Sequence, residues 1–266
     1  MQVIGLCRFS YPAEGGFQVE HPSPADRAAY LYAPARMEER FRTFEAFTLP
    51  SLLAQTDPDF TFLVVIGEDL PAPWRPRLEA LLAGLPQAVL MPRPPGPHRR
   101  VMQSAFNAVR RAGAACLQFR LDDDDAVARG FVESLRAAAR DCAGLLARER
   151  HVAFDFNQGF VARPGAAGIE AARVQEPFWT PALGMALAPG VPLSIMNFGH
   201  MKLPRAMPCV SFTGEDMFIR GHNDHNDSRQ KKGVKRFALS PLDTAGEAHF
   251  RDTFGVDAAA VRRLYS

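Results

Sequence analysis

The stretch Cys116-Leu117-Gln118-Phe119-Arg120-Leu121-Asp122-Asp123-Asp124-Asp125 joins an apolar run of strand length to four consecutive aspartates. Like charges at such close spacing repel, so solvent, protons or a cation must compensate them. A strand that ends in carboxylates directly before a helical pattern suits a divalent metal held against a phosphate. The other interpretation is a solvated turn in which one Asp caps the next helix, although four carboxylates exceed what a cap needs.

Strands and helices alternate on both sides of this stretch. Such alternation predicts a doubly wound α/β sheet, and near-continuous apolar runs are typical of parallel strands covered on both faces. We therefore expect a single α/β domain with a mostly parallel central sheet flanked by helices. The expected strands are residues 3–9, 61–66, 88–91, 116–121, 151–156, 160–161 and 174–177, and the expected helices are residues 37–55 with a kink at Pro50, 73–83, 101–111, 126–148 and 257–265.

Composition and charge exclude several classes of protein. Of the 266 residues, 47% are hydrophobic and 23% are charged, which is ordinary for a soluble globular protein. A net charge of +2 gives no global pull toward nucleic acid or membrane, so we expect no nucleic-acid partner. No apolar run approaches the roughly 18 residues of a spanning helix, which leaves peripheral attachment as the form of membrane association to consider. Four scattered cysteines without a CxxC pair indicate reduced thiols and a cytoplasmic protein.

The aspartate run also carries a resemblance to a known family. Asn107, the small turn Ala112-Gly113-Ala114-Ala115, an apolar strand and then Asp122 to Asp125 are similar to the central motif of GT-A glycosyltransferases of the family-2 type. More closely, the chain resembles the putative rhamnosyltransferase family. That likeness extends over most of the chain, through Arg8 with Phe9-Ser10-Tyr11, Glu39-Arg40, Phe44-Glu45, Pro50-Ser51-Leu52 before Gln55-Thr56, and a late His-Asn-Asp segment.

The resemblance implies a GT-A-like (Rossmann-like) fold and transfer of a sugar from a nucleotide diphospho-sugar to a hydroxyl acceptor. The family name implies rhamnose, and the implied acceptor is a carbohydrate or glycoconjugate such as a surface polysaccharide. Residues 1–126 would form the donor-binding half, and residues 127–266 the acceptor-binding and C-terminal half of the same domain. The residues implied in donor binding are Arg8, Glu68, Asp69, Arg100, Asn107, Asp122 and Asp123.

Within that set, the roles differ. Asp122 would face the donor ribose or first phosphate. The acid after the second strand would bind the base, and Glu68 or Asp69 stands in that place. The usual Asp-Gly-Ser is missing there, so the choice of nucleotide stays open. Arg100 belongs to the basic run His98-Arg99-Arg100, which suits a phosphate or, equally, a solvated surface.

The resemblance also implies a divalent metal, Mn or Mg. Asp124 would hold it, and Asp125 is the alternative ligand because a run of four acids lets the motif slide by one position. In several GT-A enzymes a late His completes the metal site. His222 and, second to it, His225 stand in that place, and imidazole can serve a Mn ion. A lone His is more often structural.

Glu215-Asp216 resembles the Glu-Asp pair in which inverting family-2 enzymes place their catalytic base. Asp216, favoured over Glu215, would remove the proton of the acceptor hydroxyl as that oxygen attacks the anomeric carbon. The metal would stabilise the departing diphosphate. The alternative is a pair of exposed loop acids. Trp179 would stack on the acceptor, or else serve as a packing anchor.

Two other functions fit the same residues. A metal-dependent phosphoesterase or nuclease would use these acids and histidines to activate water, commonly at two metals. A non-catalytic module would bind a nucleotide sugar without turning it over. P-loop and Gly-x-Ser-x-Gly motifs do not occur in the chain, which argues against P-loop and serine-hydrolase activities.

Overall fold

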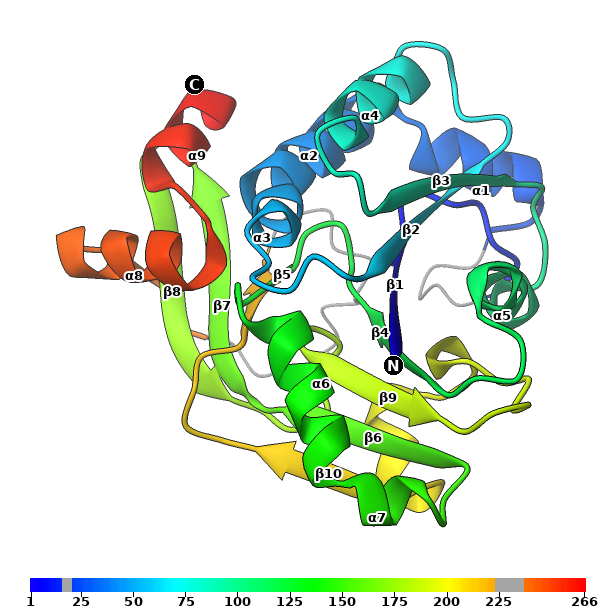
Figure 1. Cartoon of the computed structure of the whole chain (residues 1–266). Coiled ribbons are helices and arrows are strands. Elements are labelled where there is room, and N and C mark those ends of the chain that lie inside the picture. Colours follow the sequence, from blue (N-terminus) through cyan, green and yellow to red (C-terminus); the bar gives the residue numbers. More distant parts are fainter. Residues whose placement is uncertain (16–20, 223–236) are drawn as a thin grey trace.

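The computed structural model describes residues 1–15, 21–222 and 237–266, which form two sheets with helices packed around them (Figure 1). The larger, central sheet has seven strands in the order β10-β6-β9-β4-β1-β2-β3. Its strands run parallel except β9, which is antiparallel to both neighbours. This confirms the expected α/β fold with a mostly parallel central sheet. The bounds are β1 Gln2–Arg8, β2 Thr61–Gly67, β3 Ala88–Arg93, β4 Cys116–Arg120, β6 His151–Phe156, β9 Leu183–Leu187 and β10 Cys209–Phe212.

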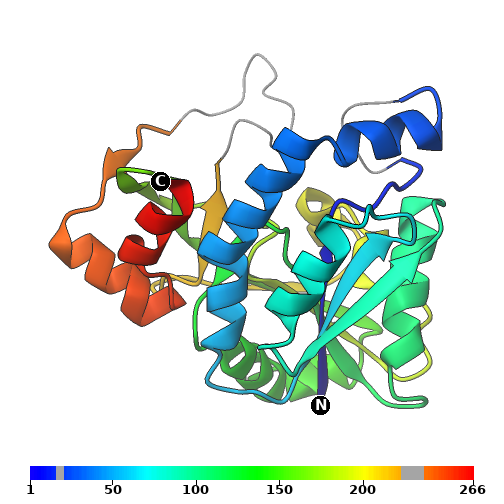
Figure 2. The ribbon, with the colours of Figure 1, turned by 90° about the horizontal axis from the view of Figure 1, so that it is seen from above.

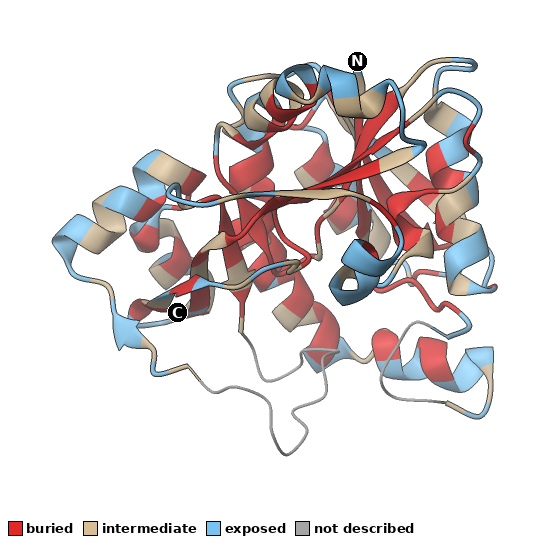
Figure 3. Cartoon of the chain, turned by 90° about the horizontal axis from the view of Figure 1, so that it is seen from below, coloured by how far each residue is buried: buried red, intermediate tan, exposed pale blue. Residues whose placement is uncertain are grey.

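Helices cover both faces of the central sheet, so β1, β2, β4, β6 and β9 are almost wholly buried, whereas the edge strands β3 and β10 are partly exposed (Figure 3). On one face Phe62 and Val64 of β2 pack with residues of α2, α4 and α6. On the other face Leu63 and Val65 pack with Phe106 of α5. Burial on both faces explains why these strands read as continuous apolar runs in the sequence. The bounds are α2 Pro34–Thr43, α4 Trp74–Leu82, α5 His98–Val109 and α6 Phe131–Asp141.

The smaller sheet has five strands in the order β12-β8-β7-β11-β5, antiparallel except for the β7–β11 pair. Helices α8 and α9 lie beside the β7–β8 hairpin, on the side of the molecule away from α5 (Figure 1). Because β5 directly follows the aspartates, the acidic turn links the two sheets. The bounds are β5 Ala126–Val127, β7 Gln158–Gly165, β8 Gly168–Gln175, β11 Phe218–Gly221, β12 Ser240–Pro241, α8 Thr244–Phe254 and α9 Ala258–Tyr265.

Two expected helices differ from the structure. The helix expected over residues 126–148 begins only at Phe131, because Ala126 and Val127 pair with β11, and a short separate helix α7 (Ala143–Leu146) follows it. The helix expected over residues 37–55 is α2, a π-helical segment η1 (Phe44–Thr48) and α3 (Leu49–Leu53) in direct succession. Figure 2 shows these three as one continuous helix in the middle of the molecule.

Strands from both sides of residue 126 build the central sheet, and the expected division at this residue falls inside β5. The remaining short elements are α1 (Pro24–Leu31) and the 3-10 turns η2 (Ile195–Asn197) and η3 (His200–Arg205). Within the described ranges, no helix combines the length and the apolar character needed to cross a bilayer.

Candidate active site

The four aspartates lie where the chain passes from the central sheet to the smaller sheet. The N–H of Leu121 donates to the carbonyl of Leu6 in β1 (3.0 Å). In the β1–β4 register Leu6 faces Arg120, which brings Arg8 alongside Asp122. The turn therefore stands beyond the carboxyl ends of β1 and β4. Parallel α/β sheets gather their ligands at this edge.

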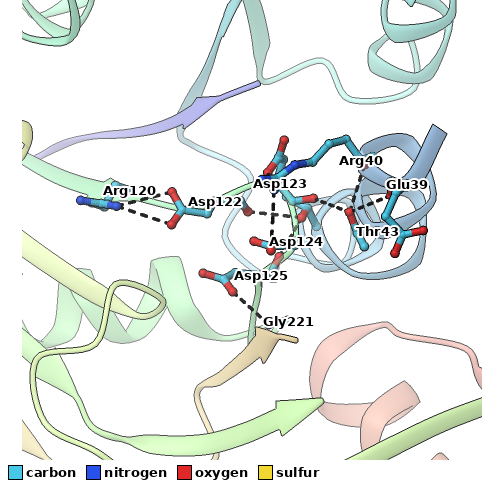
Figure 4. A network of polar contacts seen from close by, with 10 residues as sticks. Glu39, Arg40, Thr43, Arg120, Asp122, Asp123, Asp124, Asp125 and Gly221 are labelled. Carbon is cyan, nitrogen blue, oxygen red and sulfur yellow. Dashed lines mark hydrogen bonds and ion pairs between the residues drawn. The ribbon is translucent and has the colours of Figure 1, made fainter. Parts of the chain in front are cut away.

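Helix α2 and the π-helical segment η1 hold the acidic turn from one side (Figure 4). Thr43 Oγ1 donates to the carbonyl of Asp123 (3.4 Å), and Thr48 Oγ1 donates to that of Asp125 (2.8 Å). In a π-helix the hydrogen bonds span five residues instead of four. This wider turn lets two hydroxyls five positions apart reach the same loop. Single π turns inside α-helices recur at functional sites.

Three of the four aspartates are buried: Asp123, Asp124 and Asp125 are 3%, 6% and 4% exposed. The side chain of Arg40 is buried as well, and its Nη1 lies 2.6 Å from Asp123 Oδ1 and 3.7 Å from Asp124 Oδ2. The N–H of Gly221 donates to Asp125 Oδ1 (3.0 Å). A Cβ at position 221 would overlap the backbone of Asp124, so only glycine permits this close approach.

The buried carboxyls take up protons more readily than exposed ones. Burial raises the pKa of Asp124 to about 7, with the repulsion of Asp123 adding to it and the attraction of Arg40 opposing it. Burial also raises the pKa of Asp125 well above its usual range, and the neighbouring Asp124 adds to this. Near neutral pH, protons and Arg40 therefore compensate much of the negative charge of this part of the turn.

Asp122 has different surroundings. Its side chain is 40% exposed and points toward Arg120, whose Nη2 lies 3.5 Å from both carboxylate oxygens (Figure 4). Burial acts to raise the pKa of this carboxyl, but Arg120, Arg8 and Arg220 together lower it. Asp122 is therefore ionised at neutral pH among three guanidinium groups. We call Arg8, Arg120 and Arg220 the arginine cluster.

Two histidines lie in the positive field of the arginine cluster. Burial, with the repulsion of Arg8 and Arg120, lowers the pKa of His98 to about 3. Burial also lowers the pKa of His200, and Arg120 adds to this, so both imidazoles are neutral at neutral pH. Among the described residues, the Nε2 of His98 and the Nε of Arg120 are buried without a hydrogen-bond partner. Two such atoms beside one cluster indicate a place where a ligand completes the bonding.

Trp179 joins the site through Arg220. The guanidinium carbon of Arg220 lies 4.6 Å from the centroid of the Trp179 ring, and the ring also packs on Phe218. The neighbouring Phe178 has a φ of 58°, in the left-handed region that L-residues rarely adopt. Its N–H donates to Asp155 Oδ1 (2.9 Å), which holds the loop in this conformation. Strain of this kind persists only where surrounding contacts hold it, and it gathers at functional sites.

The other residues expected in donor binding lie on two elements, the loop after β2 and helix α5. Glu68 and Asp69 follow β2 at the same edge of the sheet. Both are exposed, and Asp69 accepts a hydrogen bond from Tyr32 Oη (3.0 Å). Arg100 is exposed in the first turn of α5. Asn107 lies about two turns further along α5, and its amide donates to a backbone carbonyl of the loop before η2 (2.9 Å). The structure therefore does not bring Asn107 to the aspartates.

The expected base, Asp216, is also away from the aspartates. It lies before β11, whereas Asp125 contacts Gly221 at the other end of that strand, and five residues of extended chain span about 16 Å. Its carboxylate accepts from Gln158 (3.0 Å) and pairs with Arg173 (2.8 Å) and His249 (3.0 Å). Asp216 thus links α8 to the β7–β8 hairpin. Its neighbour, the expected second base Glu215, is an exposed loop residue.

His222 and His225 were the expected histidine ligands. His222 directly follows β11, so it stands one residue beyond the Gly221 contact to Asp125, and its N–H donates to the carbonyl of Ala162 (2.8 Å). The structure therefore brings His222 to the edge of the acidic turn. His225 lies outside the described residues.

These surroundings do not fit the metal site that the resemblance implies. A divalent ion needs ionised, accessible oxygens with room for water and phosphate, whereas Asp124 and Asp125 are buried and bonded to Arg40 and Gly221. Asp122 is ionised and partly exposed, but the arginine cluster repels a cation there. The described ranges contain no group of three or more His, Cys, Asp or Glu side chains that could hold a metal. Both expected ligands are buried and contact other parts of the chain, Asp124 through Arg40 and Asp125 through Gly221.

Arg8 and Trp179 were expected site residues, whereas no role was expected for Arg40, Arg220 or His200. Arg40 lies 83 positions from Asp123, and Arg220 and His200 are equally remote in the chain. The available signal was weak: Arg40 belongs to the Glu39-Arg40 pair of the family likeness, and Arg220 belongs to the polar segment that follows Gly214. Neither pattern predicts that Arg40 and Arg220 lie close to the aspartates.

A sequence profile of the family described as "Putative rhamnosyl transferase" matches residues 2–235. No curated protein matches the chain. Among solved structures, S. aureus TarS 1–349 is similar to 83% of this chain at 9% identity with a TM-score of 0.45, over 60% of its own length. Its complex with UDP-GlcNAc is similar to 85% of this chain at 10% identity, again with a TM-score of 0.45 and over 60% of its length. A further S. aureus TarS structure is similar to 62% of this chain at 10% identity with a TM-score of 0.34, over 22% of its length. The chain thus spans less than two thirds of each of these relatives.

Proposed function

The chain belongs to the family of putative rhamnosyl transferases, and from that premise we propose that it transfers a sugar from a nucleotide diphospho-sugar to a hydroxyl acceptor. The observation that carries the proposal is the arginine cluster around the ionised Asp122, beyond the carboxyl ends of β1 and β4. Guanidinium groups bind phosphate oxygens through paired hydrogen bonds. The same edge of an α/β sheet is where nucleotides bind.

The proposed chemistry is a single displacement with inversion. The acceptor oxygen bonds to the anomeric carbon as the bond from that carbon to the diphosphate oxygen breaks, and the electron pair of the broken bond leaves with the diphosphate. The acceptor proton passes to a base or to solvent. Asp216 and Glu215 precede β11, at the end of that strand away from the aspartates, so this proposal does not use them as the base. The arginine cluster stabilises the negative charge that grows on the diphosphate. Asp122 orients Arg120 through their 3.5 Å contact.

The substrates of the proposal follow from chemistry and family together. The transferred sugar is a hexose, and rhamnose is the choice that the family description supports. The acceptor is a carbohydrate or glycoconjugate, for which the Trp179 ring beside Arg220 offers a flat stacking surface. We place the reaction in the cytoplasm, in keeping with four cysteines that are all free thiols.

The proposal is tested by incubating the protein with UDP-, GDP- and dTDP-linked hexoses, rhamnose included, with and without oligosaccharide acceptors. One donor is expected to release its nucleoside diphosphate only when an acceptor is present. Arg120→Gln is expected to lower kcat/KM by roughly 10- to 100-fold, since it removes a charge-assisted hydrogen bond to phosphate. The matched control is Arg75→Gln, at an exposed pair on α4, which is expected to have no effect.

Three other outcomes would contradict the proposal. Equal release without an acceptor would indicate a hydrolase, as the phosphoesterase alternative requires. Binding of a nucleotide sugar without turnover, in the native protein and in Arg120→Gln alike, would indicate a non-catalytic module. Failure of every nucleotide sugar to bind would remove the donor site altogether.

A further inference from the structure

We propose that the arginine cluster, and not a divalent cation held by the aspartate run, neutralises the diphosphate of the donor. This inference rests on the proposed function, and it concerns which groups of the same site neutralise the negative charge of the diphosphate. It gives the four aspartates two structural duties: Asp123, Asp124 and Asp125 anchor the turn, and Asp122 positions an arginine. The part of the site that meets the anion is then made of guanidinium groups.

The buried half of the turn is already committed to contacts within the protein. Arg40 reaches Asp123 at 2.6 Å and Asp124 at 3.7 Å, and the Gly221 amide reaches Asp125 at 3.0 Å. The backbone of the same turn is bonded to the hydroxyls of η1 and the end of α2. A metal at Asp124 or Asp125 would have to displace these contacts and enter a region from which solvent is excluded. Both changes cost free energy that an exposed site would not.

The partly exposed half of the turn, at Asp122, lies among positive charges. Asp122 is the one aspartate of the four that is partly exposed, and three arginines act on it. The register of β1 against β4 places Arg8 alongside Asp122, and Arg120 contacts both carboxylate oxygens. Three guanidinium groups thus act on one ionised carboxylate in this half of the turn. Positive charge gathered in this way attracts an anion and repels a free cation.

Two unpaired groups show where the anion would bind. The Nε of Arg120 and the Nε2 of His98 are buried and lack a hydrogen-bond partner among the described residues. Buried polar groups are otherwise nearly always paired, so a ligand with several acceptor oxygens fits beside them. His98 also opens helix α5, which has 12 residues and no side-chain cap, and its own N–H donates to the carbonyl of Glu14 (3.0 Å). The N–H groups at such a helix start bind anions.

Arg220 is held in place from the other side. Its guanidinium stacks on Trp179 at 4.6 Å, and the loop that carries Trp179 is fixed through the bond from Phe178 to Asp155. A guanidinium that is held before the ligand arrives loses less freedom on binding. The preorganised cation therefore takes the role that a metal would otherwise fill.

The test is calorimetric titration of the full chain with inorganic pyrophosphate, in EDTA and again in Mn²⁺, together with a titration of Mn²⁺ alone. Pyrophosphate is expected to bind with the same Kd, within about threefold, in both buffers, and Mn²⁺ alone is expected not to bind. Arg120→Gln and Arg220→Gln are each expected to weaken binding roughly 10- to 100-fold. Arg120→Lys is expected to lose less, because it keeps the charge. Asp124→Asn and the surface control Arg75→Gln are expected to bind as the native protein does.

Folding of each variant is checked by its thermal midpoint, so that lost binding is not lost structure. Pyrophosphate binding that tightens tenfold or more with Mn²⁺ and returns to the EDTA value in Asp124→Asn would overturn the inference while leaving glycosyl transfer intact. Donor turnover without pyrophosphate binding in either buffer would overturn it too. Failure of both pyrophosphate and every nucleotide sugar to bind would instead remove the proposed function.

Discussion

Replacing Arg40 by Met removes a cation that contacts two buried aspartates. The structure places Arg40 Nη1 2.6 Å from Asp123 and 3.7 Å from Asp124, with each of the three side chains less than a tenth exposed. Breaking a buried ion pair from one side leaves an uncompensated charge and costs about 3–5 kcal/mol of the free energy of unfolding. In a chain of this size, that loss lowers the thermal midpoint by roughly 6–20 °C.

Urea denaturation at pH 7.5, followed by tryptophan fluorescence, measures this loss as a fall in the transition midpoint. The double variant Arg40→Met/Asp123→Asn removes both members of the pair and is expected to recover more than half of the loss, because no buried charge is stranded. The matched control is Arg42→Met in the same helix, where an exposed guanidinium lies 5.8 Å from the Tyr265 ring, with an expected cost of about 1 kcal/mol or less. An Arg40→Met variant no less stable than Arg42→Met would refute the view that the aspartates anchor the turn.

Three further outcomes follow from the same contacts. Because the pKa of Asp124 is raised to about 7 in the folded chain, the contribution of this carboxyl to stability is present at low pH and is lost as the pH rises through 7. Asp124→Asn should therefore flatten the fall of the urea midpoint between pH 5 and 8, and at pH 8 it should be about 2–4 kcal/mol more stable than the native protein. A variant less stable than the native protein at pH 8 would contradict this. Asp155→Ala frees the Phe178 N–H and loosens the loop whose Trp179 holds Arg220, so it should raise the KM of both the donor and the acceptor; an unchanged donor KM would count against Arg220 as a preorganised contact to the diphosphate. Asp216→Asn weakens pairs whose partners are half exposed, so it should cost about 1 kcal/mol or less with kcat within threefold of native, whereas a thousandfold fall in kcat would restore Asp216 as the base.

The central strands could be predicted from the sequence because a strand that is buried on both faces consists of an unbroken run of apolar residues. β1 and β2 lie within a residue or two of their expected ranges. β5 shows the opposite case. Ala126 and Val127 precede an alanine-rich segment and suggest helix, but their pairing with β11, more than 90 residues later, decides their structure.

The position of the acidic turn was predicted from the sequence, whereas its contacts with the rest of the chain were not. Four adjacent carboxylates require a proton, solvent or a cation, and the sequence favoured a metal. The structure compensates them with Arg40, with raised pKa values and with the amide of Gly221. Arg40 and Gly221 lie about 80 to 100 positions from the turn. No local spacing shows such contacts, because only the folded chain brings the partners together.

The most direct test of the account is the fate of the sugar in EDTA. The protein, the donor that it binds and an oligosaccharide acceptor are mixed with EDTA. The mass of the acceptor is then measured by mass spectrometry, and the released nucleoside diphosphate is quantified in the same sample. One added sugar on the acceptor is expected for each nucleoside diphosphate released, with a roughly 10- to 100-fold lower rate in Arg120→Gln. Free sugar in place of the glycosylated acceptor would contradict glycosyl transfer, and product that forms only after Mn²⁺ is restored would contradict the arginine cluster as its source of positive charge.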